Sequence, residues 1–259
     1  MADPQNQLRV DINNALQSFA SMSLHDAAIA LLGTLGYQSD KVITVPGSDP
    51  GAFLELLSEH NPGVRIDKDK ALFNDWVKAE ILFQLTDDEL SNQVSLFKSN
   101  SINSGLLQSY LFFAIELKQQ DYSRGKLTAI ARQLNRVFPM PVMVFIKHCD
   151  LVSIAVINRR RNKRDTEKDV LGKVTIIRSI SLLTPHRGHL DILNSFALPA
   201  LSEKTTIRCF DDLHAAWEEI FNVELLNKKF YRELSSWYFW AMQHVRFPHD
   251  IAESDKENL

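Results

Sequence analysis

Three apolar runs in the middle of the chain, with one helical segment between the first two, constrain the fold more than any other feature. The runs are SYLFFAIELK (Ser109–Lys118), MPVMVFIK (Met140–Lys147) and LVSIAVIN (Leu151–Asn158), and their aromatic and β-branched residues are typical of buried strands. A helical pattern spans Lys126–Phe138. The order strand, helix, strand, strand predicts an α/β domain with a central mixed sheet flanked by helices on both faces.

Shorter patterns predict further elements on both sides of this centre. Leu8–Leu32 has helical spacing and predicts two helices divided near Ser21–Ser23, and Lys41–Val45 (KVITV) predicts a short strand. Ala71–Leu85 is strongly apolar and is expected to be part helix and part strand. The remaining predicted elements are a helix over Ala52–His60 capped by Asp49, a strand over Lys173–Leu182 and a short helix within Pro185–Leu193.

The character of the chain changes near residue 200. We expect an α/β domain over residues 1–200 and a helical extension over residues 201–259, with amphipathic helices at Phe210–Phe221 and Leu225–Val245. Trp237, Phe239 and Trp240 make the second of these helices apolar well beyond one stripe. Two interpretations stay open: the helix packs fully within this chain, or it offers a face to a partner.

Composition narrows the function classes. The chain has 259 residues, 45% of them hydrophobic, and a formal net charge of −3, so any nucleic-acid binding must come from a local basic patch. Two cysteines without metal-ligand spacing fit a reduced, cytoplasmic setting. The polar N-terminus does not resemble a signal peptide, and no apolar stretch approaches the roughly 18 residues of a membrane span.

Glu116 and Lys118 end the first apolar run and form the main candidate site. Alternate side chains of a strand share a face, so Glu116 and Lys118 are expected to emerge together where the strand meets water. A Mg²⁺-dependent nuclease needs carboxylates to hold the ion beside the scissile phosphate, and a lysine two residues along the strand can orient the attacking water. The spacing Glu-x-Lys is common, and its place at the end of a buried strand gives it weight.

A basic segment follows the third apolar run. In RRRNKRDTEKD, five cations stand close together in an otherwise acidic protein, and they are Arg159, Arg160, Arg161, Lys163 and Arg164. Such a run is either a solvated loop or a contact for the phosphates of a nucleic acid, which basic residues bind electrostatically. We expect the run to lie beside Glu116, which strengthens the second interpretation. His186 and His189 are three apart, and without a carboxylate or cysteine partner a capping role is favoured over metal binding.

Several blocks resemble the N-terminal region of large restriction–modification proteins of the class IIS (type IIG) adenine-specific DNA methylase family. The resemblance extends from about Ala28 to Phe247, and the blocks that carry it are SYLFFAIELK, DYSRGKLTAIARQLNRVFPMPVMVFIK, INRRRNKRDTEKDVLGKVTIIRSI, PHRGHLDIL and LNKKFYRELSSWYFWA. In that family the region precedes the methyltransferase and is similar to the PD-(D/E)xK nuclease fold. The resemblance therefore implies phage defence by restriction, with DNA as substrate and Mg²⁺ as cofactor.

The resemblance also implies roles for particular residues. Glu116 would be a metal ligand, Lys118 would position water, and Gln133 on the following helix would support the metal site. The nuclease motif expects a further acid ahead of Glu116, but Leu90–Ile115 contains none, and Asn103 stands near the expected position. An amide suits Mg²⁺ poorly. The acids that could replace it are Asp87 and Asp88, if their loop folds back, and Glu80, which is expected on a helix ahead of the sheet.

The methyltransferase expected downstream is missing from this sequence. The chain has no Asn-Pro-Pro-(Tyr/Phe) motif and no glycine-rich loop after a strand, so we expect no S-adenosylmethionine site here. It resembles an excised domain, a truncated gene product or a separately encoded subunit. Two hypotheses follow: a Mg²⁺-dependent DNA endonuclease module, or a non-cleaving DNA-binding scaffold whose helix Leu225–Val245 docks on a DNA methyltransferase domain or subunit.

Overall fold

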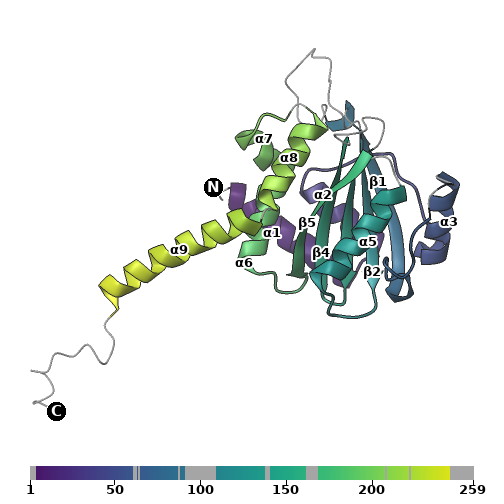
Figure 1. Ribbon diagram of the computed structural model, residues 1–259. Coiled ribbons are helices and arrows are strands. Elements are labelled where there is room, and N and C mark those ends of the chain that lie inside the picture. The colour runs from purple at the N-terminus through teal and green to yellow at the C-terminus, as the bar shows by residue number, and fades with distance from the viewer. Residues whose placement is uncertain are drawn as a thin grey trace, which may run out of the picture. The chain divides into compact units, whose positions relative to one another are not determined.

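The computed structural model describes residues 4–60, 63, 65–86, 88–90, 109–137, 141–161, 169–207, 209–221 and 223–245 (Figure 1). Its centre is a five-stranded sheet in the order β1-β2-β3-β4-β5. Only β2 and β3 run parallel, and the other neighbouring pairs are antiparallel. The strands are β1 (Trp76–Thr86), β2 (Ser109–Leu117), β3 (Val142–His148), β4 (Leu151–Arg161) and β5 (Asp169–Ser181).

The alternation of β2 divides the interior into two layers, as its sequence predicts. Tyr110, Phe112 and Ala114 belong to one buried cluster, and Leu111, Phe113, Ile115 and Leu117 belong to the other. Every one of these side chains is at most 5% exposed. Apolar side chains on both faces require cover on both faces, and helices on both sides of the sheet provide it.

Two sets of helices cover the two faces of the sheet (Figure 1). α3 (Pro50–His60) and α5 (Arg124–Val137) pack against the face that carries Phe113 and Ile115. The opposite face is covered by α1 (Pro4–Gln17), α2 (Leu24–Thr34), α6 (Arg187–Phe196), α7 (Leu198–Lys204) and α8 (Phe210–Ile220). The α/β architecture with a mixed sheet and flanking helices is confirmed.

A buried tyrosine joins three of the covering segments. The Tyr37 hydroxyl donates to the Phe196 carbonyl oxygen at 2.7 Å and accepts from the Trp217 indole nitrogen Nε1 at 2.9 Å. Tyr37 and Trp217 are completely buried. Burial therefore raises the pKa of the Tyr37 hydroxyl far above its ordinary range and keeps it neutral. The hydroxyl satisfies two polar groups that would otherwise be unpaired in the core.

Residues from Asn222 onward form a separate unit, while Phe221 and everything before it form the first. The division therefore falls later than residue 200, because α8 packs into the first unit through Trp217. In the second unit, α9 (Val223–His244) exposes most of its large apolar side chains, including Trp237 at 61% and Phe239 at 65%. None of the described helices combines the length and apolar composition needed to cross a bilayer.

Three expectations about local structure need correction. Lys41–Val45 is not a strand, because its backbone is irregular. It lies beside the edge strand β1, where the Lys41 carbonyl oxygen accepts a hydrogen bond from Gln84 N. Within Ala71–Leu85, a 3-10 turn at Phe73–Asp75 leads into β1, so Glu80 lies on a strand and not on a helix. Arg159–Arg161 continue β4 beyond the apolar run, where they pair with Leu171, Val170 and Asp169.

Side-chain caps begin three of the described helices, and two of these caps, Asp49 and His186, were predicted. Ser23 accepts from Asp26 N at the start of α2, and Asp49 accepts from Ala52 N at the start of α3. His186 caps α6, where its Nδ1 atom accepts from Gly188 N at 3.0 Å. The capping role favoured for His186 over metal binding is confirmed.

The Tyr37 network predicts a stability effect. Tyr37→Phe should lower the free energy of unfolding by about 1–3 kcal/mol, because the Trp217 indole N–H and the Phe196 carbonyl would lose their shared partner inside the core. Chemical denaturation measures this change. Tyr231→Phe on α9, where the ring is 63% exposed, should stay within about 0.5 kcal/mol of the parent. Equal effects of the two substitutions would contradict the role assigned to Tyr37.

Candidate functional site

A cluster of charged side chains lies near the ends of β1, β2 and β3. The Lys147 ammonium is 2.6 Å from Glu116 Oε1, and the Lys78 ammonium is 3.8 Å from Glu116 Oε2. Both contacts follow from strand register, because Glu116 pairs with Lys78 across β1 and with Lys147 across β3. Side chains paired in this way point to the same face of a sheet. Glu116 thus lies between two lysines.

Glu80 brings a second carboxylate to this face. It pairs with Ala114, two residues before Glu116, so Glu80 and Glu116 are diagonal neighbours whose Cα atoms are about 7–8 Å apart. The Glu80 side chain is nearly buried at 3% exposure, and its carboxylate accepts a hydrogen bond from the Ser48 hydroxyl. The sequence singled out Glu80 without Ser48, since no pattern joins residues so far apart in the chain.

Lys118 does not join the cluster. β2 ends at Leu117, and the Lys118 ammonium donates to the Asn74 carbonyl oxygen at 2.7 Å. Its backbone N–H donates to the Asp75 carbonyl. The lysine that hydrogen-bonds Glu116 is therefore Lys147 on the neighbouring parallel strand, which ends an apolar run just as Lys118 does.

Two other predicted site residues lie elsewhere. Gln133 is buried on α5, where its side-chain oxygen accepts from Asp67 N at 3.1 Å, on the face of the sheet opposite Glu116. Asp88 is exposed just beyond the end of β1 that pairs with Ser109. Ser109 precedes Glu116 by seven residues, about 23 Å along a strand. The structure brings neither residue to Glu116, and Asp87 and Asn103 lie outside the described residues.

The basic segment begins at the opposite end of the sheet from Glu116. Through β3, the row of Glu116 aligns with Val152 on β4, and Arg159 lies seven residues further along β4, again about 23 Å away. The expected position beside Glu116 is therefore wrong for Arg159, Arg160 and Arg161. The reason is topological: the β3–β4 hairpin reverses the chain, so β4 ends at the end of the sheet opposite Glu116. Lys163 and Arg164 lie outside the described residues.

The cluster can support two kinds of chemistry. Two carboxylates can share a Mg²⁺ ion, which in many phosphate-handling sites takes one or two carboxylates together with water and substrate oxygens. Two ammonium groups can attract a phosphate. Within the described ranges, no three His, Cys, Asp or Glu side chains come together to hold a metal. A Mg²⁺ site here would therefore need water or substrate to complete its ligands.

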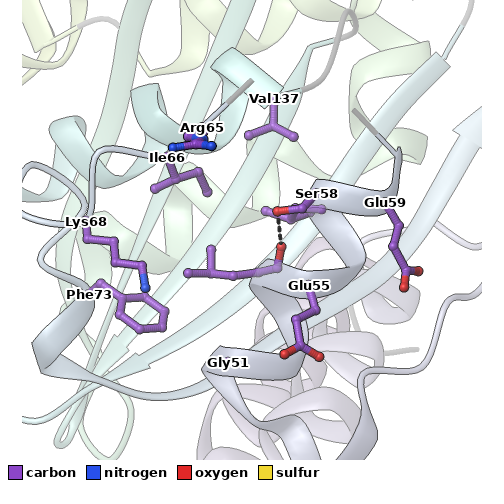
Figure 2. Close-up of a pocket in the computed structure, with 11 residues that line it drawn as sticks. Gly51, Glu55, Ser58, Glu59, Arg65, Ile66, Lys68, Phe73 and Val137 are labelled. Carbon is purple, nitrogen blue, oxygen red and sulfur yellow. Dashed lines mark hydrogen bonds between the residues drawn. The ribbon is translucent and has the colours of Figure 1, made fainter. Parts of the chain in front are cut away.

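A cavity of about 590 Å³ lies on the other face of the sheet (Figure 2). Its lining includes the buried side chains of Leu57 and Val137 and also Lys68, whose ammonium is 5.1 Å from the centre of the Phe73 ring. These residues come from α3, from the end of α5 and from the segment before β1. The cavity is thus separated from Glu116 by the sheet and is not part of this site.

His148, next to Lys147, makes a buried hydrogen-bond chain that the sequence did not indicate. Its Nδ1 atom lies 2.6 Å from the Gln120 carbonyl oxygen, and its Nε2 atom lies 3.2 Å from Ser153 Oγ. Ser153 Oγ also accepts from Ser179 N, at a residue with φ of 57°. A neutral imidazole that donates from Nδ1 and accepts at Nε2 satisfies every group. Burial lowers the pKa of His148 below its usual value, which favours this neutral form.

Comparisons of the chain with models of protein families, with characterised proteins and with experimentally determined structures give no match.

The lowered pKa of His148 predicts how stability depends on pH. Between the lowered folded pKa and the unfolded value of about 6.5, the unfolded chain binds more protons, so the free energy of unfolding should rise as pH rises through this window. His148→Gln should reduce that slope, with the remainder due to His189, whose pKa burial also lowers. Denaturation at a series of pH values between 5 and 7.5 measures the slope. His244→Gln on α9 is the control, and an unchanged slope in His148→Gln would contradict the assignment.

Proposed function

We propose that this chain is the DNA-interacting, nuclease-like domain of a restriction–modification system, with a PD-(D/E)xK-like fold and Mg²⁺-dependent phosphodiester cleavage as its activity. The observation that carries the proposal is the pair of carboxylates, Glu80 and Glu116, on neighbouring strands with Lys147 in contact with Glu116. The resemblance of the sequence blocks to type IIG proteins supports the restriction setting, and the reduced-cysteine composition supports a cytoplasmic one.

The residues of the cluster divide the work. Glu80 and Glu116 would hold the Mg²⁺ ion, which when bound supplies positive charge that offsets the charge developing on the phosphate. Lys147 would take the place expected for Lys118 and orient the attacking water or contact the phosphate. Lys78 is 45% exposed in its side chain and adds positive charge at the outer side of the cluster. Gln133 and Asp88 have no part in this arrangement.

The basic segment would bind DNA at a distance from the cleavage site. Arg159–Arg161 lie about 23 Å from the row of Glu116, which equals about seven base pairs at the 3.4 Å rise per strand of duplex DNA. Arg159, Arg160, Arg161, Lys163 and Arg164 would then supply phosphate contacts that position the DNA without reading its sequence.

A second candidate function is a scaffold that keeps the fold without cleaving. It is favoured by the pairing of both Glu116 oxygens with lysines and by the near burial of Glu80, since these contacts occupy the carboxylates. The exposed aromatic side chains of α9 would then dock on a DNA methyltransferase domain or subunit. The partner is proposed on the resemblance alone.

Cleavage tests the first function directly. The purified chain should convert supercoiled plasmid to nicked or linear forms with Mg²⁺ or Mn²⁺, and Glu116→Gln and Glu80→Gln should each reduce the rate by about 100-fold or more, as loss of charge stabilisation commonly does. Lys147→Met should reduce it as well, whereas Lys118→Met and Asp88→Asn should cleave like the parent.

The controls separate the two candidates. Lys118→Met removes a lysine from the same end of the sheet without touching Glu116, and Asp88→Asn removes a carboxylate from the opposite end. Cleavage lost in Lys118→Met but kept in Lys147→Met would contradict the assignment of the lysine. Salt-sensitive DNA binding without cleavage by any variant would support the scaffold.

DNA binding tests the basic segment. Arg159→Gln/Arg160→Gln/Arg161→Gln should weaken binding to any duplex and lower the slope of log affinity against log salt by roughly 2–3, because each phosphate contact contributes about 0.9. Fluorescence anisotropy at 50–300 mM salt, roughly the range in which such contacts dominate, measures the slope. The matched control, Lys126→Gln/Arg132→Gln/Arg136→Gln, removes three cations from α5. An equal loss in both variants would show that the segment has no special role.

A further inference from the structure

We propose that the Lys147 ammonium and a divalent cation compete for the Glu116 carboxylate, so that cation binding must release Lys147. The inference deepens the proposed function and rests on it. It concerns how Lys147 controls the access of the ion to Glu116 before the ammonium turns to the phosphate.

Lys147 already occupies a Glu116 oxygen that a cation would need. Lys147 Nζ lies 2.6 Å from Glu116 Oε1, which is a direct charged hydrogen bond. A Mg²⁺ ion would bind the same oxygen at about 2.0–2.1 Å. Two positive centres at such short distances from one oxygen repel each other strongly. Lys78 lies 3.8 Å from the other oxygen, so a positive charge stands near each oxygen of Glu116.

The register of the sheet fixes the contact between Lys147 and Glu116. The parallel register of β2 and β3 places Lys147 directly beside Glu116, on strands whose backbones are about 4.8 Å apart. Both side chains are only 19% exposed, so water screens their attraction less than at an open surface. The pair is therefore the resting state of the site, and the ion must compete with it.

Release from Glu116 makes the Lys147 ammonium available to a phosphate. Lysine carries its charge on a flexible stem of four carbons, so Lys147 can leave Glu116 and reach a nearby anion without any backbone change. A phosphodiester is the anion that the proposed function supplies. Cation binding and phosphate binding would then favour each other, and by linkage each would raise the affinity for the other by the same factor.

Mn²⁺ binding tests the competition without any need for cleavage. Free Mn²⁺ is measured by electron paramagnetic resonance during titration of the full chain without DNA. Lys147→Met should bind Mn²⁺ about fivefold more tightly than the parent, the factor that corresponds to about 1 kcal/mol for a partly exposed ion pair. Lys147→Arg, which keeps the charge, should bind like the parent. Lys118→Met should also bind like the parent, because its ammonium lies on the Asn74 carbonyl.

The outcomes distinguish failure of this inference from failure of the proposed function. If Glu116→Gln abolishes Mn²⁺ binding but Lys147→Met leaves it unchanged or weaker, the competition is wrong and the carboxylate site stands. If the parent binds no Mn²⁺ and Lys147→Met binds none either, or if Glu116→Gln and Glu80→Gln bind like the parent, the proposed cation site itself is wrong. Circular dichroism and thermal midpoints confirm that each variant is folded, and Lys147→Arg provides the folded reference if Lys147→Met is unstable.

Discussion

The parallel pairing of β2 with β3 is the constraint on which the rest of the structure depends. A parallel pair cannot be joined by a tight turn, so α5 must cross one face of the sheet to connect the two strands. This crossing buries one face of β2, and α1, α2 and α8 bury the other. The same pairing brings the ends of two apolar strands side by side. The residue before the last is charged in each strand, and the parallel register sets these two residues side by side, so Glu116 and Lys147 meet.

Much of the fold follows from local pattern. The strands β2, β3 and β4 and the helix α5 could be predicted because their apolar periods are long and unambiguous. The strand predicted for Lys41–Val45 (KVITV) is wrong. β propensity describes how well a side chain fits a pleated surface, and this segment only lies beside the edge strand β1. Glu80 was assigned to a helix because Ala71–Leu85 is too apolar throughout to show a period. A strand with both faces buried has no alternation to detect.

The candidate site shows where reasoning from spacing stops. Glu116 was found because it ends a buried strand, and Lys118 was paired with it by the alternation of a strand that in fact ends at Leu117. Once the strand ends, alternation no longer fixes direction, and the Lys118 ammonium bonds the Asn74 carbonyl instead. Lys147 carried the same local signal as Lys118. Choosing between them required the register of β2 against β3, which depends on how α5 packs and cannot be read from either strand alone.

The two ends of the sheet also explain why closeness in sequence misled the placement of the basic segment. The β3–β4 hairpin reverses the chain direction, so the last residues of β4 lie at the end of the sheet where β2 and β3 begin. Lys147 and Arg159 are only twelve positions apart in sequence, and they lie at opposite ends of the sheet along the strand direction. A carboxylate lies between two lysines at the Glu116 end of the sheet, whereas the three consecutive arginines 159–161 belong to β4 at the other end. Under the proposed function, an extended polyanion could contact both ends of the sheet, whereas a small anion could reach only one of them.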